Sequence, residues 1–227
     1  MRMILSDARV ARTIALILCA FFPIAAAAAA GDGINRPEAG AVSTTAHTYT
    51  LQDLERQLQA TPRLRGRFIQ EKHLRDLPQP LVSEGHYVLS LGDGLLWFLE
   101  KPVEQALRIT PDGIAQRNSD GRWNPAGSPS GRRQDTRLFL AVLTGDTAAL
   151  QENFDLALSG TGDEWTLTLT PRGSLLRQIF RDIIIRGDTT VRRISLNETQ
   201  GDRSELILLD TELIDTLTPE EQRAYQH

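Results

Sequence analysis

The chain is almost without cysteine, and this absence excludes several kinds of chemistry. Its single cysteine, Cys19, lies within residues 1–30. A chain that loses those residues has no thiol, which excludes disulfide bonds, thiolate catalysis and zinc sites with cysteine ligands. Stability must then come from an ordinary apolar core, and about 180 residues are enough for one core of single-domain size.

Basic residues are also scarce. The chain has 25 Lys and Arg residues against 29 Asp and Glu residues, a net charge of −4. Residues 1–30 carry three of the arginines and one aspartate, so their loss would leave a net charge of −6. Proteins that bind phosphate backbones rely on clustered Lys and Arg, and nucleic acid is therefore not an expected partner.

No apolar run is long enough for a typical transmembrane helix, which needs about twenty residues. The longest run, TIALILCAFFPIA at residues 13–25, is interrupted by Pro23. Three arginines precede this run and a row of alanines follows it, an arrangement typical of a secretory signal peptide. We therefore expect residues 1–30 to be a signal peptide that is cleaved near Ala30.

Ordered structure is expected to begin near Tyr49. Residues 31–48 contain few large apolar side chains and many small or turn-forming ones, which is typical of a flexible leader. Thr50 then offers a helix N-cap, with Asp53 three positions later. The leucines that follow share one face, so the pattern predicts an amphipathic helix that ends before Pro62.

From Leu64 onwards the apolar period becomes two, the period of a strand with one solvated face. Turn signals separate the strands, among them Pro111-Asp112-Gly113 and Gly201-Asp202. About ten or eleven strands result, nearly all joined as hairpins, with two or three short helices and a polar tail at residues 216–227. The predicted fold class is mainly β with α, a strongly curved antiparallel sheet covered by short helices.

One of these strands is apolar on both faces. In GLLWFLEKP, residues 94–102, five apolar residues follow one another before Glu100. A strand with one wet face alternates apolar and polar residues, so we expect another element to cover the second face of this strand.

Four stretches, taken in succession, resemble the LolA family of periplasmic lipoprotein carriers, and in particular its divergent branch. They are RGRFIQEKHL, PLVSEGHYVLS, LLWFLEKPVEQALRITPDGI and LRQIFRDIIIRGDTTVRRISLNETQGDRSELILLD, and they lie within residues 50–213. The resemblance implies one domain, residues 49–215, that forms an unclosed β-barrel with helices as a lid. Its apolar cavity would hold lipoprotein acyl chains in the periplasm.

The resemblance also implies the partners. A monomer without a cofactor would take acylated cargo from an inner-membrane transporter and deliver it to an outer-membrane acceptor. The main branch of the family has an arginine that helps to hold the lid shut, and Leu91 stands at that position here. Two alternatives are therefore open: a carrier of another lipid or a polyene, and a cargo-free docking protein of an envelope assembly or export machine.

The residues expected to bind the acyl chain are all apolar. Those expected in the cavity are Phe68, Tyr87, Leu89, Trp97, Leu99, Leu107 and Ile109. Those expected in the lid are Leu138, Phe139, Val142, Leu143, Leu175, Leu176 and Ile179. Every one of them could instead fill an ordinary core. Leu95 lies beside a glycine turn, at the end of the sheet that the resemblance places near the cavity mouth, and it is either a candidate contact for the transporter or an ordinary edge residue.

Catalysis is the weakest hypothesis. His73 and His86 lie on the polar faces of neighbouring strands, near Glu71 and Glu84 in the sequence. Two imidazoles and two carboxylates could bind a metal or act in acid-base chemistry if they met. Their spacing is only that of strands, and no third group orients them. We therefore expect no enzyme, no catalytic residue and no metal site.

Overall fold

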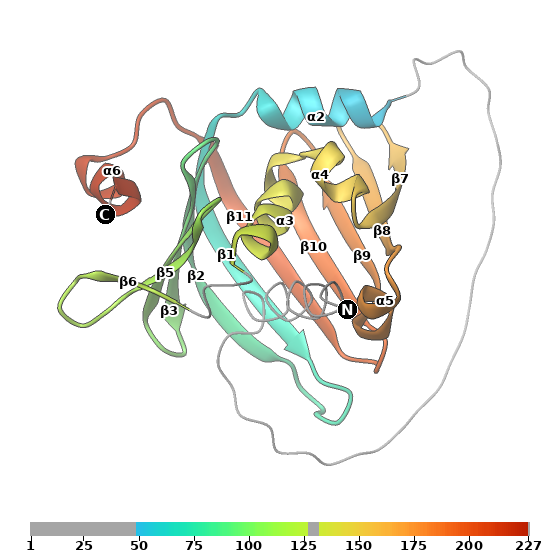
Figure 1. The fold of residues 1–227 in the computed structure, drawn as a ribbon, viewed down its shortest axis with the longest axis horizontal. Coiled ribbons are helices and arrows are strands. Elements are labelled where there is room, and N and C mark those ends of the chain that lie inside the picture. Colours follow the sequence, from blue (N-terminus) through green and yellow to red (C-terminus); the bar gives the residue numbers. More distant parts are fainter. Residues whose placement is uncertain (1–48, 127–131, 227) are drawn as a thin grey trace, which may run out of the picture.

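The computed structural model describes residues 49–126 and 132–226, and its largest element is one antiparallel sheet of eleven strands (Figure 1). The strand order is β6-β5-β4-β3-β2-β1-β11-β10-β9-β8-β7. Neighbours in the sheet are consecutive in the sequence, except where β1 pairs with β11. β6 and β7 form the two edges, so the curved sheet does not close. The predicted fold class is confirmed.

The elements have the following bounds. The strands are β1 (Arg63–His73), β2 (Leu81–Ser90), β3 (Gly94–Lys101), β4 (Gln105–Thr110), β5 (Gly113–Arg117), β6 (Trp123–Pro125), β7 (Phe154–Gly160), β8 (Trp165–Pro171), β9 (Phe180–Gly187), β10 (Val191–Glu198) and β11 (Arg203–Leu213). The helices of the described residues are α2 (Leu51–Gln59), α3 (Arg132–Thr144), α4 (Thr147–Gln151), α5 (Ser174–Ile179) and α6 (Pro219–Gln226).

Two predictions lie outside the described residues, namely the signal peptide at residues 1–30 and the leader at residues 31–48. Within the described ranges, no helix combines the length and the apolar character that crossing a membrane requires.

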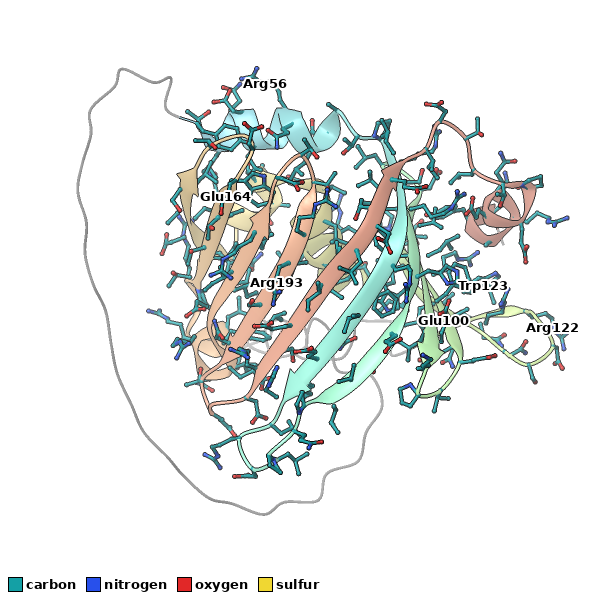
Figure 2. All side chains as sticks on the ribbon, turned by 180° about the vertical axis from the view of Figure 1, so that it is seen from behind. Arg56, Glu100, Arg122, Trp123, Glu164 and Arg193 are labelled. Carbon is teal, nitrogen blue, oxygen red and sulfur yellow. The ribbon has the colours of Figure 1, made fainter. Side chains whose placement is uncertain are left out.

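The helices lie on both faces of the sheet (Figure 1). α3 and α4 lie over one face, which we call the inner face, while α2 crosses one end of the sheet and α5 lies toward the other end. α6 packs on the opposite, outer face against β3. Elsewhere the outer face carries polar side chains such as Arg193, which pairs with Glu205 at 2.5 Å (Figure 2). The apolar core therefore lies on the inner face, under the helices.

α2 forms where the capping pattern predicts it. The Thr50 hydroxyl accepts a hydrogen bond from the Asp53 backbone N–H at 3.2 Å, and the Asp53 carboxylate accepts one from the Thr50 N–H at 2.9 Å. Leu54 and Leu58 of this helix are buried in the core.

The Gln57 side chain ties α2 to the sheet. Its amide nitrogen donates hydrogen bonds to the carbonyl oxygens of Gly162 at 3.0 Å and Asp188 at 2.5 Å. We expect Gln57→Leu to lower the free energy of unfolding by about 2 kcal/mol, because the Gly162 carbonyl loses its side-chain donor and the Tyr49 hydroxyl loses its acceptor, while the Asp188 carbonyl keeps Trp165 Nε1 as a donor. Urea denaturation measures this loss. The exposed control Gln52→Leu should stay within about 0.5 kcal/mol, and equal losses in both variants would contradict the role of Gln57.

α6 explains why β3 is apolar on both faces. Leu95 joins the core on the inner face, whereas Leu96 points outward and is nevertheless fully buried. The Tyr225 hydroxyl of α6 donates a hydrogen bond to the Val88 carbonyl oxygen at 2.7 Å, and the Gly94 carbonyl oxygen lies 3.3 Å from the same hydroxyl. The element that covers the second face is thus the polar C-terminal tail, which sequence analysis did not connect with this strand.

Candidate functional site

The inner face carries apolar rows that run across the strands. Residues paired between neighbouring strands point to the same face of a sheet. One row consists of Leu64, Leu89, Leu95, Ile109 and Ile114, and the next contains Tyr87, Trp97 and Leu107. The Phe68 ring stacks on Trp97 with ring centroids 3.7 Å apart. These rows form the floor of the candidate site.

α3 covers this floor. The side chains from Leu138 to Leu143 are all buried, none with more than 8% of its surface exposed. A helix that is apolar all round is buried on all sides. α3 accordingly packs against α2, α4, β4 and β5. It lies inside the curve of the sheet and its side chains belong to the same apolar cluster as the floor.

The structure brings most of the predicted cavity and lid residues together. Of the strand residues, six are buried in the core cluster and Leu99 packs against it, the six being Phe68, Tyr87, Leu89, Trp97, Leu107 and Ile109. The lid residues buried in the same cluster are Leu138, Phe139, Val142, Leu143 and Leu176. Ile179 packs against the cluster, whereas Leu175 is half-buried outside it. Their role in binding stays a prediction, because an ordinary core would bury them too.

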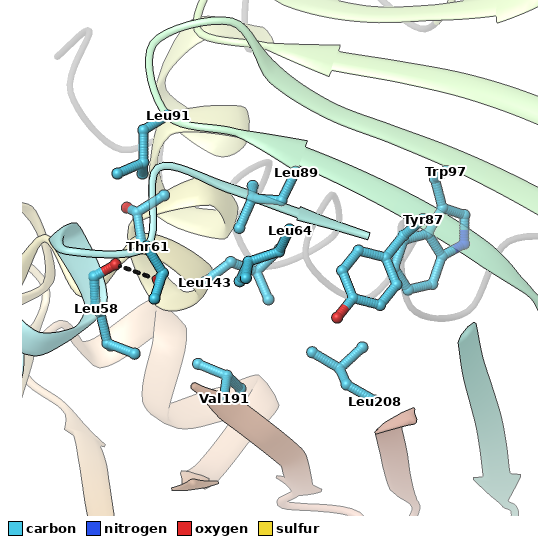
Figure 3. Close-up of a pocket in the computed structure, with 11 residues that line it drawn as sticks. Leu58, Thr61, Leu64, Tyr87, Leu89, Leu91, Trp97, Leu143, Val191 and Leu208 are labelled. Carbon is cyan, nitrogen blue, oxygen red and sulfur yellow. Dashed lines mark hydrogen bonds between the residues drawn. The ribbon is translucent and has the colours of Figure 1, made fainter. Parts of the chain in front are cut away.

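Side chains of the floor and of α3 leave little free space beside Tyr87 and Trp97. The enclosed cavity there has a volume of about 10 Å³, room for about one water molecule (Figure 3). A vacant cavity for an acyl chain was expected, and this cavity is far too small for one. Leu143 of α3 lines it and belongs to the same apolar cluster as the floor.

A wide groove opens beside this cavity, between α3, α4 and the turns that follow β2 and β4. Its volume is about 1030 Å³, at the upper end of the roughly 300–1,000 Å³ that small-molecule sites occupy. Leu89, Leu91 and Thr144 line both the groove and the cavity. A shift of α3 away from the turn between β2 and β3 would therefore join the groove to the interior.

Sequence reasoning missed several residues that line the small cavity, namely Leu58, Leu64, Val191 and Leu208. Alternation along β11 places Leu206 and Leu208 on one face, and this signal could have identified Leu208. No local signal indicates Val191, because its position depends on the pairing of distant strands.

Leu95 does not lie on the surface. Its side chain is 0% exposed, because Leu89 of β2 and Ile109 of β4 pair with it from both sides under the helices. The contact of Leu95 with a partner stays a prediction, and it would require that the helices over Leu95 move away.

The two histidines considered for metal or acid-base chemistry lie apart. His73 Nε2 is 3.2 Å from Glu71 Oε2, and His86 Nδ1 is 2.7 Å from Glu100 Oε1. In the sheet, His86 stands opposite Arg67 and not opposite His73. Each imidazole is therefore paired with a carboxylate of its own. No group of three or more His, Cys, Asp and Glu side chains in the described part of the chain could hold a metal ion.

All three tyrosines have a pKa above the ordinary value of 10.0, and burial is the largest cause at Tyr49, Tyr87 and Tyr225. An acid whose pKa is higher in the folded chain than in the unfolded chain adds stability below the unfolded pKa. That contribution is lost as the pH rises through the folded pKa.

We therefore expect native tyrosines to resist ionisation at pH 10, where an unfolded chain is half ionised. Ultraviolet absorbance of tyrosinate measures this, and the free energy of unfolding should fall above pH 10. Half-ionised tyrosines in the folded protein at that pH would contradict the expectation.

Comparison with known proteins gives one match over most of the sequence. The family model described as outer membrane lipoprotein carrier protein LolA-like matches residues 39–216. No curated protein sequence matches the chain. Among solved structures, the MucA/MucB complex of Pseudomonas aeruginosa gives 13% identity and a TM-score of 0.46, over 75% of this chain and 59% of that chain. The chain thus spans less than two thirds of that protein.

Two further structures are similar over nearly their whole length. A LolA superfamily protein from Nitrosomonas europaea gives 10% identity and a TM-score of 0.40, over 78% of this chain and 97% of that chain. A putative outer membrane lipoprotein-sorting protein domain from Vibrio parahaemolyticus gives 8% identity and a TM-score of 0.42, over 79% of this chain and 98% of that chain.

Proposed function

The chain belongs to the family of LolA-like outer membrane lipoprotein carrier proteins, and we propose that it carries the acyl chains of lipoproteins across the periplasm. Members of this family are carriers and not enzymes, so the binding of cargo is driven by burial of apolar surface. The observation that supports the proposal best is the continuous apolar cluster shared by the sheet floor and α3, with an open groove beside it.

An acyl chain gains enough from burial to open such a closed form. Each CH₂ group contributes about 0.8 kcal/mol, so a chain of about fourteen gains roughly 11 kcal/mol on leaving water. Exposure of one Leu or Phe side chain of α3 costs roughly 1.5–3 kcal/mol. When α3 moves away from the floor, the bound acyl chain would cover the apolar surface that α3 exposes there. This contact would offset much of the cost of moving α3. The closed structure is then the empty carrier, and cargo stabilises the open state.

Entry takes place through the groove. Leu91 lines both the groove and the small cavity, at the position where the main branch of the family has an arginine. Apolar contact at Leu91 replaces a polar contact there, so closure depends on the packing of α3 against the turn between β2 and β3. The cargo is placed between α3 and the floor residues Phe68 and Trp97.

The route follows from this mechanism. A monomer receives its cargo from an inner-membrane transporter and gives it to an outer-membrane acceptor. Each transfer requires only a partner that binds the open state better than the closed one. No cofactor and no covalent step is needed.

A second candidate function is favoured by one observation. The cavity beside Tyr87, Trp97 and Leu143 has a volume of only about 10 Å³, and most of the floor and lid residues are buried as in an ordinary core. A cargo-free docking protein of an envelope assembly machine would have such an interior and would use the sheet as a binding surface.

Equilibrium binding of a fluorescent palmitoylated peptide separates the two functions. We expect the palmitoylated peptide to bind and the same peptide with an acetyl group to remain free. Competition by free palmitate or by a phospholipid would identify the cargo as another lipid. Equal behaviour of the palmitoylated and acetylated peptides would contradict the carrier and support the docking protein.

A further inference from the structure

The outer face of the sheet carries two parallel rows of side chains next to α6. The covered row, which lies under α6, consists of Arg65, Val88, Leu96, Arg108 and Ala115. The second row, which α6 does not cover and which we call the open row, lies two residues further along each strand and consists of Arg67, His86, Phe98 and Ala106, of which Ala106 is buried. In both rows the members come from neighbouring strands, starting at β1.

The covered row shows how this surface holds a helix. Glu221, in the first turn of α6, accepts hydrogen bonds from the Arg65 guanidinium to both carboxylate oxygens, at 2.8 and 2.9 Å. Near the other end of α6, Arg108 donates a hydrogen bond to the Ala224 carbonyl oxygen at 2.9 Å. Cations suit the carbonyl end of a helix. Between the two arginines, Leu96 supplies a fully buried apolar floor.

The open row presents the same chemistry. The Arg67 side chain, at the β1 end, is 61% exposed and reaches a carboxylate of Asp210 only at 4.0 Å. At the other end, the Arg117 guanidinium of β5 lies 6.0 Å from the ring centroids of Phe98 and of Trp123. The backbones of β1 and β5 are four strand spacings apart, about 19 Å, and the Arg117 side chain reaches back from β5 toward Phe98 of β3. A helix of about thirteen residues covers that backbone span.

The floor beside Arg67 and next to the Arg117 guanidinium is aromatic. The half-buried Phe98 ring stacks on His86 with ring centroids 4.6 Å apart. Trp123, also half-buried, lies on the same side of the molecule as α6 (Figure 2). Arginine and aromatic side chains are enriched at the centres of protein interfaces. Glu100 approaches this floor too, where it is paired with His86.

We propose that the open row is a docking site for a helix of a protein partner. The helix has acidic residues in its first turn and one apolar face, and it packs alongside α6. Two residues along a strand span about 7 Å, close to the usual 8–10 Å between packed helices. The covered row supplies the recognition pattern. Because the chain is otherwise acidic, with a net charge of −4, the arginines Arg67 and Arg117 favour an acidic partner at this place.

Two synthetic helical peptides of about fourteen residues test this site. They share one leucine face and differ in the first turn, which carries glutamates in one and lysines in the other. Fluorescence anisotropy should show binding of the glutamate peptide, weakened at least about tenfold by Arg67→Glu with Arg117→Glu. The lysine peptide should gain affinity on this double variant. Arg186→Glu, exposed on β9 of the same face, is the matched control and should change neither affinity.

Equal affinity for the two peptides, or an unchanged affinity in the double variant, would overturn the proposal. Binding of anionic phospholipid vesicles that is lost in the double variant would assign the row to a membrane surface instead. Dimerisation that is lost in the double variant would assign it to a second copy of the chain. Binding of palmitoylated peptide should be the same in the double variant, because Arg67 and Arg117 lie on the opposite face from the carrier site, so the two proposals fail separately.

Discussion

Phe139→Glu should abolish binding of palmitoylated peptide and lower the free energy of unfolding by about 4 kcal/mol. Phe139 lies in α3 and is 3% exposed, within the cluster that joins lid and floor. A carboxylate there can stay hydrated only if α3 remains away from the sheet. The lid then cannot close over an acyl chain, and the apolar site becomes wet. Peptide binding and urea denaturation measure the two effects.

A second substitution separates loss of binding from loss of folding. Phe139→Ala should cost a similar 3–5 kcal/mol, because it leaves a cavity, yet it should keep or improve binding, since an acyl chain can fill that cavity. Gln178→Glu adds the same carboxylate at an exposed position of α5 and should change neither property. Equal loss of binding in the glutamate and alanine variants would show that Phe139 serves only as core.

Gly85→Ala should lower the free energy of unfolding by about 3 kcal/mol or more. A Cβ atom at this position would lie 1.9 Å from the Phe98 carbonyl oxygen and 2.8 Å from the Phe68 ring. Gly85 is paired with Phe68 across β1 and β2, and the space that it leaves lets the ring lie against Trp97. To make room for this Cβ atom, the β3 backbone at Phe98 and the stacked rings of Phe68 and Trp97 would have to move together. We therefore expect little structural relaxation.

The matched control for this variant is Gly173→Ala. A Cβ atom there would meet nothing within 4 Å, so the substitution should cost at most about 1 kcal/mol, through the helix start of α5. Urea denaturation of both variants measures the difference. A Gly85→Ala protein as stable as its control would mean that the Phe68 and Trp97 stack does not depend on this glycine.

Local patterns were sufficient for the strands and the fold class, whereas they predicted two or three short helices and the described residues form five. The capping pair Thr50 and Asp53 marks the start of α2, and glycine-containing turns such as Gly92-Asp93-Gly94 separate the strands. These signals act within four residues of the chain, so they can be read without knowledge of the tertiary structure. The inward face of each strand follows from alternation, which placed residues such as Phe68 and Trp97 correctly.

Long-range packing could not be predicted in the same way. The pattern of β3 indicated a cover for Leu96, but the choice of α6 depends on contacts such as that between Tyr225 and Val88, 137 positions apart in the sequence. The amount of free space in the interior depends on how deep α3 lies within the curve of the sheet. The same depth buries Leu95, which its place beside a glycine turn suggested to be exposed.

The central claim is that the space under α3 shelters a hydrocarbon chain. Its most direct test is purification of the protein under native conditions from the cells that produce it, followed by extraction with organic solvent and mass spectrometry of the extract. We expect acyl material from the unchanged protein and from Phe139→Ala, and none from Phe139→Glu. An extract without acyl material from the unchanged protein, or equal amounts from the glutamate variant, would contradict the carrier function.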